Sequence, residues 1–384
     1  MRLTIVGPSV EGGISLYCHH QANAFAELGV EVTLICTPEH CTTQRVAYRR
    51  LAILPALPKD HTRNSKATRT LRQLANIMAG ARRTAQALAA EPPQPVLTHF
   101  SEYLAPFWAW RFHRLRRRGF TFHTVLHDPK RNYRVGPAAW HVFSVNQAFK
   151  LYNTIFVHAN ERGDAPAHLP LVTVPHGVFE TPATDRSRAE VRESLEIPQD
   201  APLLIQFGFI RDYKNLDLVI RALARVSGVY LLVAGAEHGG SRPASFYKAL
   251  ADEVGVADRC RFLIDFHDSV AAANLLTASD ALCLTYSANF VSASGVLAIA
   301  VHHRLPALVS CGLLEMRTTV ETYGIGRWVE PDSVESIVDG LVALLSNPPA
   351  AEWGRYERER SWLCNAELIL AAVTEAPSGQ TPVR

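Results

Sequence analysis

The chain has 384 residues, of which 48% are hydrophobic and 20% charged, and its net charge at pH 7 is +3. This composition excludes a largely disordered protein, the length suits two domains better than one, and no apolar run is long enough to predict a membrane-spanning helix. Seven scattered cysteines without a Cys-x-x-Cys pair argue against a disulfide framework or zinc site and favour reduced thiols in a cytoplasmic protein.

The chain opens with a pattern typical of a βαβ unit. Residues 3–6 predict a strand, 7–13 a glycine-containing loop, 14–28 a helix and 30–36 a second strand, which together indicate a parallel sheet. The loop lacks the Gly-x-Gly-x-x-Gly fingerprint of dinucleotide-binding proteins, so nicotinamide binding is not supported. Gly13, at the helix start, would let a ligand approach the backbone closely, unless it serves only the turn.

The next part of the chain is strongly basic. Residues 45–118 contain 15 Lys or Arg against three acidic residues and so carry +12, which leaves −9 for the remainder. This asymmetry predicts an anionic partner: a phosphorylated acceptor, a membrane surface or nucleic acid. Residues 66–90 predict an amphipathic helix, and residues 103–118 a helix that mixes aromatic with basic side chains. Interfacial membrane helices have such a mixture, but aromatics packed on a sheet with arginines in water are the commoner arrangement.

Four further strands are predicted in this half, at residues 96–99, 120–126, 156–158 and 172–174. His127 and Asp128 directly follow the second of these strands, at the carboxyl end where α/β sheets present ligand groups. His127 would hydrogen-bond a substrate hydroxyl, and Asp128 would orient the imidazole or take a proton. We place the first domain boundary at residue 178, before a polar segment.

The second half, residues 179–350, begins with a pattern typical of an anion site. Residues 203–207 predict a buried strand that ends at Gly208, and a short loop with Arg211 and Lys214 leads into a helix. Free N–H groups at a helix start, together with nearby cations, bind phosphate groups in many proteins. The alternative is an ordinary strand-to-helix turn with solvated charges.

Strand and helix patterns then alternate. The expected strands are 230–234, 261–264, 280–284 and 307–310, and the expected helices are 245–254, one ending near 279, 296–301 and 333–346. Ser294 and Gly295 precede the third of these helices, and such small residues expose backbone N–H groups to a second phosphate or a hydroxyl. Residues 351–384 are expected to form one helix, over 351–372, that packs back across the domains, and a short tail.

These motifs together resemble retaining nucleotide-sugar glycosyltransferases of the GT-B fold, specifically glycosyltransferase family 4, over nearly the whole chain. The resemblance rests on the order and spacing of Gly12-Gly13, His127-Asp128-Pro129, Pro175-His176-Gly177-Val178 and residues 208–217, 280–286, 294–297, 305–306 and 312–315. It implies an α/β fold of two Rossmann-like, doubly wound domains facing a central cleft. Residues 1–178 would then bind the acceptor, and residues 179–350 the nucleotide sugar.

The resemblance also implies roles for single residues. The donor diphosphate would be held by Arg211, Lys214 and the helix-start amides of residues 294–296, the nucleoside would lie against Glu237 and Ile264, and His127 would contact the transferred sugar. The expected catalytic residues are His127, Asp128, Arg211 and Lys214. The expected donor-binding residues are Gly13, Gly208, Glu237, Ile264, Tyr286, Ser294, Gly295 and Val296.

One departure from the family pattern stands out. Family members carry two glutamates eight residues apart, and Val291 and Ile299 occupy those positions here, as in a divergent branch. The groups that hold the ribose and sugar hydroxyls are therefore open. No Asp-x-Asp motif occurs, so the expectation is a UDP- or GDP-sugar donor, no metal and no other cofactor, with a saccharide, lipid-linked or small-molecule acceptor.

Three other interpretations follow from the same residues. The absence of both glutamates is compatible with a GT-B-like protein that binds nucleotide sugars or glycans without catalysis. Nucleic-acid binding would explain the basic segment, but no helix-turn-helix, RNA-recognition or zinc pattern accompanies it. Peripheral contact of residues 45–118 with an anionic membrane, at its inner face, is compatible with the enzyme.

Overall fold

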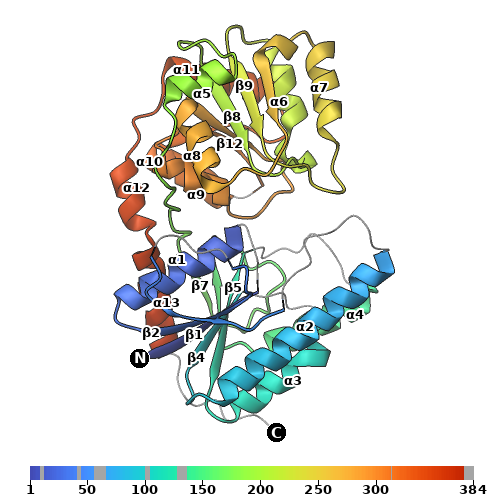
Figure 1. Cartoon of the computed structure of the whole chain (residues 1–384), viewed down its shortest axis with the longest axis vertical. Helices are drawn as coiled ribbons and strands as arrows, with labels where there is room; N and C mark the ends of the chain where they lie inside the picture. The colour runs from blue at the N-terminus through green and yellow to red at the C-terminus, as the bar shows by residue number, and fades with distance from the viewer. Residues whose placement is uncertain are drawn as a thin grey trace. The chain divides into compact units, whose positions relative to one another are not determined.

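The computed structural model of the chain describes residues 1–8, 13–40, 45–55, 66–99, 104–127, 136–312 and 314–375. The chain forms two α/β units (Figure 1), one comprising Met1–Gly177 with Arg360–Arg384 and the other Val178–Glu359. Each unit has a parallel sheet with helices on both faces, which confirms the predicted class of two Rossmann-like, doubly wound domains. Among the described residues, no helix has the length and apolar character needed to cross a bilayer.

Unit 1 contains a seven-stranded sheet in the order β3-β2-β1-β4-β5-β6-β7. Its central strands are almost continuously buried, as expected when helices cover both faces of a parallel sheet. The order reverses between β1 and β4, and ligands of such sheets bind outside the strand ends at that point. The strands are β1 (Arg2–Gly7), β2 (Glu31–Cys36), β3 (Arg49–Ala52), β4 (Pro95–Thr98), β5 (Thr121–Leu126), β6 (Thr154–Val157) and β7 (Leu171–Thr173).

Five helices of unit 1 form two layers (Figure 1). One layer is made of α1 (Gly13–Glu27) and α13 (Trp362–Glu375), and the other of α2 (Lys66–Ala89), α3 (Ala105–Arg116) and α4 (Ala138–Phe149). Trp108 and Phe112 of α3 are buried against the sheet, whereas Phe107 and Trp110 are exposed. The expectation that the aromatics of this helix face the sheet therefore holds for only half of them.

Unit 2 contains a six-stranded sheet in the order β10-β9-β8-β11-β12-β13. Apolar side chains from one face of this sheet pack into a core with the helices that flank that face. Its strand order reverses between β8 and β11, so this unit has a switch point of its own. The strands are β8 (Leu203–Phe207), β9 (Tyr230–Ala234), β10 (Cys260–Leu263), β11 (Ala281–Thr285), β12 (Ala307–Ser310) and β13 (Gly326–Trp328).

Short turns and helices connect these strands. The short helix α5 begins at a capping box in which Ser187 and Glu190 bond each other's backbone N–H, a signal that the sequence reading overlooked. The helices are α5 (Arg188–Ser194), η1 (Asp212–Lys214), α6 (Leu216–Leu223), α7 (Ala244–Glu253), η2 (Ala257–Arg259), α8 (Ser269–Ala278), α9 (Gly295–His302), α10 (Leu314–Tyr323), α11 (Val334–Ser346) and α12 (Trp353–Glu359).

The prediction of one continuous helix over residues 351–372 is wrong. The chain forms two helices, α12 in unit 2 and α13 in unit 1, with a break before Trp362. The break has a local cause, because the Ser361 hydroxyl accepts a hydrogen bond from the N–H of Cys364 at 3.0 Å and so starts a new helix. The last helix therefore belongs to the unit that the N-terminus begins.

Candidate functional site

The loop after β8 is held in place by backbone hydrogen bonds. Gly208 has a φ of +84°, a left-handed conformation that favours glycine. Its N–H donates to the carbonyl of Ala234 at 2.9 Å, and the N–H of Ile210 donates to that of Ala236 at 2.9 Å. These bonds extend the pairing of β8 with β9 beyond the strand ends, so the loop leaves the sheet along a fixed path.

Lys214, at the end of this loop, is a buried cation. Its side chain is only 8% exposed, and its ammonium donates to the carbonyl of Phe207 at 2.7 Å. Its own carbonyl accepts hydrogen bonds from Gln206 at 2.9 Å and from the hydroxyl of Thr285 at 3.0 Å. Since Gln206 lies on β8 and Thr285 on β11, Lys214 is fixed at the switch point of the sheet. Burial, with Arg211 nearby as the lesser cause, lowers the pKa of Lys214 to about 7.

The start of α9 lies beside this lysine. A Cβ atom placed on Gly208 would be 3.5 Å from the Lys214 ammonium and 3.6 Å from a methyl group of Val296. Gly208, Lys214 and Val296 are therefore neighbours. The first N–H groups of a helix, here those of Gly295 and Val296, have no carbonyl of their own helix to bond to.

Ser294 caps α9 and is itself held by Tyr286. The Ser294 hydroxyl accepts a hydrogen bond from the N–H of Leu297 at 3.3 Å and lies 2.9 Å from the phenol oxygen of Tyr286, just beyond β11. Arg211 extends the cationic side of the site, with its guanidinium 5.9 Å from the ring centre of Phe209. The structure thus brings together Gly208, Arg211, Lys214, Tyr286, Ser294, Gly295 and Val296, seven of the residues predicted for the donor site.

The remaining predicted residues have other surroundings. The Glu237 carboxylate accepts a hydrogen bond from the N–H of Ala244 at 2.7 Å and so caps α7, and the Ile264 side chain packs on the core of unit 2. Gly13 is the first residue of α1 in unit 1, where a Cβ atom would meet open space. Asp128 lies outside the described residues.

The corresponding edge of the unit 1 sheet carries four histidines. His99, His127, His158 and His176 each follow one of the successive strands β4, β5, β6 and β7 within three residues. Their ring centres lie 5.4, 4.7, 5.2 and 5.3 Å, respectively, from that of Tyr17, a fully buried residue of α1. We call these five side chains the histidine cluster.

The cluster is electrically neutral near pH 7. Burial is the main cause that lowers the pKa of His99 to about 3, that of His176 to about 4, and those of His127 and His158 well below the ordinary value. Neighbouring histidines lower the values of His99, His127 and His158 further, because one charged ring would repel a second. His127 is only partly buried, unlike His99 and His158.

A chain of hydrogen bonds fixes the proton positions on His127. The carbonyl of Pro175 can only accept, so the Asn365 amide nitrogen faces it at 2.8 Å and the Asn365 oxygen accepts from the Gln21 nitrogen at 2.9 Å. The Gln21 oxygen then accepts from Nε2 of His99 at 2.9 Å. Because the single proton of neutral His99 is on Nε2, its Nδ1 is unprotonated and can only accept. Nε2 of His127 lies 3.0 Å from this Nδ1 and must therefore donate to it. This leaves Nδ1 of His127 as an acceptor.

Sequence reasoning found His127 but missed its partners. A signal similar to that at His127 was present at His99 and His158, which are the last residues of the strands predicted over 96–99 and 156–158. Gln21 and Asn365 carried no such signal, since the residues of this pair lie 344 positions apart in the chain.

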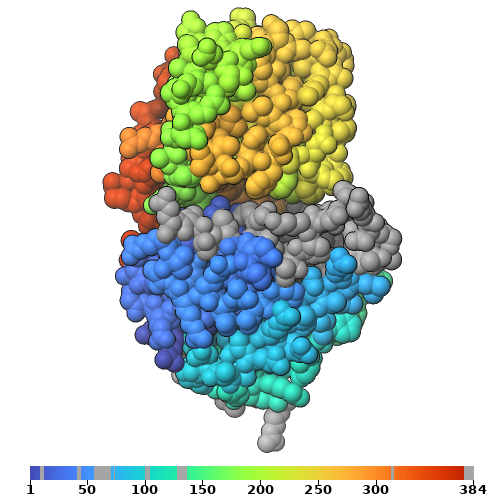
Figure 2. Space-filling model, viewed as in Figure 1, coloured from blue at the N-terminus to red at the C-terminus, as the bar shows by residue number. Residues whose placement is uncertain are grey.

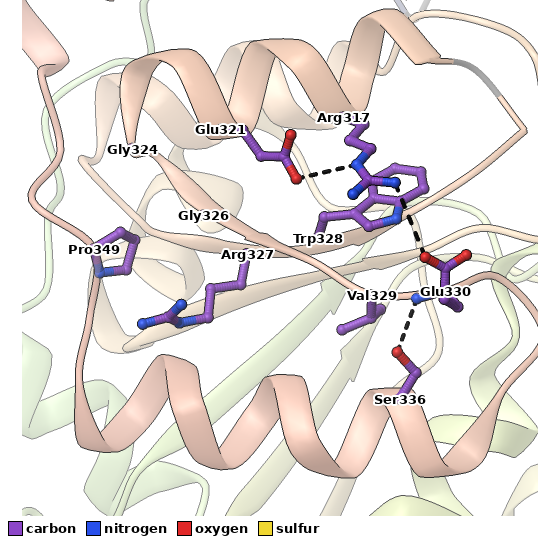
Figure 3. Close-up of a pocket in the computed structure, with 10 residues that line it drawn as sticks. All are labelled: Arg317, Glu321, Gly324, Gly326, Arg327, Trp328, Val329, Glu330, Ser336 and Pro349. Carbon is purple, nitrogen blue, oxygen red and sulfur yellow. Dashed lines mark hydrogen bonds and ion pairs between the residues drawn. The ribbon is translucent and has the colours of Figure 1, made fainter.

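A separate surface pocket of about 460 Å³ lies along the edge strand β13 of unit 2 (Figure 3). Arg317 in this pocket pairs with Glu321 at 3.1 Å and with Glu330 at 4.0 Å, as Figure 3 shows. These two carboxylates already neutralise the charge of Arg317. The pocket is therefore less suited to bind an anion than the loop of Arg211 and Lys214.

Unit 2 is similar in sequence to known proteins. Residues 187–360 match the family model described as glycosyl transferases group 1. The D-inositol 3-phosphate glycosyltransferase of Mycolicibacterium smegmatis is 30% identical over 206 residues, which are 51% of this chain and 45% of the relative. The chain thus spans about half the length of the curated relatives it matches.

Solved structures resemble the whole chain in fold. Sucrose-phosphate synthase from Thermosynechococcus elongatus gives a TM-score of 0.69 at 17% identity, with 97% of this chain and 98% of that chain covered. HepE from Anabaena, solved in complex with UDP, gives 0.68 at 14% identity, with 97% and 100% covered. WaaG, a glycosyltransferase involved in lipopolysaccharide biosynthesis, gives 0.63 at 17% identity, with 97% and 100% covered. The chain has the GT-B fold of these glycosyltransferases.

Proposed function

We propose that this protein is a glycosyltransferase that moves a sugar from a nucleoside-diphosphate donor to an acceptor. The observation that carries the proposal is the meeting of Lys214, Arg211 and the N–H groups at the start of α9 at the switch point of unit 2. Cleavage of a sugar–phosphate bond builds negative charge on the departing diphosphate. Fixed cations and helix N–H groups stabilise that charge most in the transition state, which is where stabilisation accelerates the reaction.

The acid–base state of Lys214 suits this role. With a pKa of about 7, the buried amine is partly neutral in the free protein. A diphosphate beside it would favour the charged form, so that the cation is completed when the donor binds. In the branch proposed here, Val291 and Ile299 replace the family glutamates, and the two cations would then carry more of the contact with the donor.

His127 would contact the transferred sugar in this scheme. A neutral imidazole whose Nδ1 is an acceptor would take a hydrogen bond from a sugar hydroxyl. We further propose retention of the anomeric configuration without a metal, in which the departing phosphate accepts the acceptor's proton. Transfer that persists in excess EDTA, and a product with the anomeric configuration of the donor, would support these two points.

Donor and acceptor classes follow from charge and from the relatives. Structures of HepE hold UDP and UDP-glucose, so UDP-sugars are the first donors to test, with GDP-sugars beside them. The curated relatives are named for a phosphorylated acceptor, D-inositol 3-phosphate, and the +12 segment of residues 45–118 favours an anionic acceptor here. Saccharide and lipid-linked acceptors belong in the same panel.

The test is release of nucleoside diphosphate from a panel of nucleotide sugars, with and without acceptors. Lys214→Ala should lower turnover about 10²–10³-fold while the protein stays folded. Lys248→Ala, which removes an exposed lysine of α7, is the matched control and should leave turnover unchanged. Near-normal transfer by Lys214→Ala would contradict the proposal. Donor binding without release under any acceptor would favour the non-catalytic alternative.

A further inference from the structure

The two helical layers of unit 1 differ completely in charge. Helices α1 and α13 contain three acidic residues and no Lys or Arg, namely Glu27, Glu367 and Glu375. Helices α2, α3 and α4 contain no acidic residue and eight basic ones, namely Lys66, Arg69, Arg72, Arg82, Arg83, Arg111, Arg114 and Arg116. The basic segment of the sequence is thus largely gathered in one layer, and α2 lies at the surface of this unit in Figure 2 (light blue).

Large apolar side chains are exposed on the same layer. Phe107 and Trp110 of α3 are 47% and 41% exposed, and Val142 and Phe143 of α4 are 56% and 49% exposed. The rings form one surface across the two helices, because Trp140 lies 5.7 Å from Phe107 and 5.8 Å from Phe143 between ring centres. We call Phe107, Trp110, Trp140, Val142 and Phe143 the aromatic patch. Contiguous exposed apolar surface on a folded protein marks a binding surface.

Two arginines of α3 lie beside this patch. Phe107, Trp110, Arg111 and Arg114 follow one another at helical spacing and share the outward face of α3, opposite the buried Trp108. The guanidinium groups of Arg111 and Arg114 lie 4.2 and 4.6 Å from the ring centre of Trp110. The cations therefore lie directly beside the apolar rings.

We propose that the aromatic patch docks unit 1 on an anionic lipid surface. Phenylalanine and valine side chains would enter the acyl-chain boundary, Trp110 would lie at the headgroup level, and the arginines would contact lipid phosphates. A nucleic acid fits this patch less well, because base stacking needs a free ring face and the Trp110 ring already has two guanidinium groups beside it. An acidic protein as the partner would explain the arginines but not the exposed aromatic rings on two adjacent helices.

The test is co-sedimentation of the full-length protein with vesicles of phosphatidylcholine that contain about a third phosphatidylglycerol. We expect binding that falls steeply when the salt concentration is raised and that is lost on pure phosphatidylcholine. The Phe107→Ser/Phe143→Ser double variant should lower the bound fraction about tenfold or more. The matched control is Leu368→Ser, which removes a side chain of 40% exposure from α13 in the opposite layer and should leave binding unchanged.

Three results would overturn the proposal. The first is no binding of the native protein to the anionic vesicles, and the second is equal binding by native protein and the double variant. The third is a concentration-dependent dimer, or tight binding of single-stranded RNA, that the double variant abolishes while vesicle binding is unaffected. None of these measurements uses a donor sugar. Lipid docking can therefore be refuted while glycosyl transfer is confirmed, and glycosyl transfer can be refuted while lipid docking is confirmed.

Discussion

The buried ionisable groups at the carboxyl edges of the two sheets differ in charge. In unit 1 burial makes the histidine cluster neutral, and a directed chain of hydrogen bonds runs from Asn365 through Gln21 and His99 to His127. In unit 2 burial leaves Lys214 partly charged near pH 7, beside Arg211 and a helix start. This difference in charge supports the proposed roles of the two edges, with uncharged hydroxyls as ligands of the first and a diphosphate as the ligand of the second.

The largest expected effect tests the neutrality of the histidine cluster. Because burial holds the folded pKa values below the unfolded value of about 6.5, unfolding takes up protons below that pH and stability is lost as the pH falls. Four histidines give a slope on the order of 5 kcal/mol per pH unit between pH 6 and 5. Urea unfolding followed by tryptophan fluorescence measures it. His158→Gln should lower the measured slope by about 1.4 kcal/mol per pH unit, the share of one histidine, and an unchanged slope would show that His158 titrates normally.

The next effect tests whether the charge of Lys214 serves function at the expense of stability. Lys214→Met should raise the free energy of unfolding at pH 7 by about 2 kcal/mol, because the desolvated amine disappears and only one hydrogen bond is lost. The native protein should itself become more stable as the pH rises from 7 to 10. Over this range Lys214 is mostly neutral in the folded protein but protonated in the unfolded chain, and a rising pH disfavours the state that holds the proton. Thermal unfolding measures both. A destabilised Lys214→Met would mean that this lysine holds the loop together.

A smaller effect concerns donor affinity. The charged form of Lys214 exists below its pKa of about 7, so the affinity for a nucleotide sugar should fall by up to about tenfold per pH unit above 7. Isothermal titration calorimetry with the donor identified in the panel measures it. In Lys214→Met the affinity should be weaker and independent of pH over this range. The same pH dependence in both proteins would assign it to another group.

The smallest effect tests the directed hydrogen bonds of unit 1. Gln21→Met removes the link between His99 and Asn365, so that His99 and His127 can exchange donor and acceptor roles. Long-range ¹⁵N–¹H spectra of histidine-labelled protein should show one tautomer of His127 in the native protein and a mixture in the variant. Stability should fall by about 1–2 kcal/mol. Gln86→Met, on the exposed side of α2, is the control. A mixture in the native protein would refute the assignment.

The fold and the conformation of the loop of Arg211 and Lys214 could be predicted from the sequence because their signals are local. The stretch from residue 203 to Leu223 carries its strand, glycine, cations and helix within about twenty positions, and the structure has them in that order. Strand β3 was missed because Arg49-Arg50-Leu51-Ala52 lacks a buried face, and α4, α10 and β13 were overlooked as well. The histidine cluster depends on contacts between residues far apart in the chain, which a single sequence does not reveal.

The return of α13 to unit 1 has a consequence for synthesis on the ribosome. Unit 1 is interrupted by unit 2 and needs Asn365, which follows unit 2 in the chain. Unit 2 is a continuous segment, Val178–Glu359, so all of its residues are joined to the chain before Asn365 is added. Every residue that surrounds the loop of Arg211 and Lys214 in unit 2 is therefore synthesised before α13, whereas the hydrogen bonds that order His127 need a residue of α13.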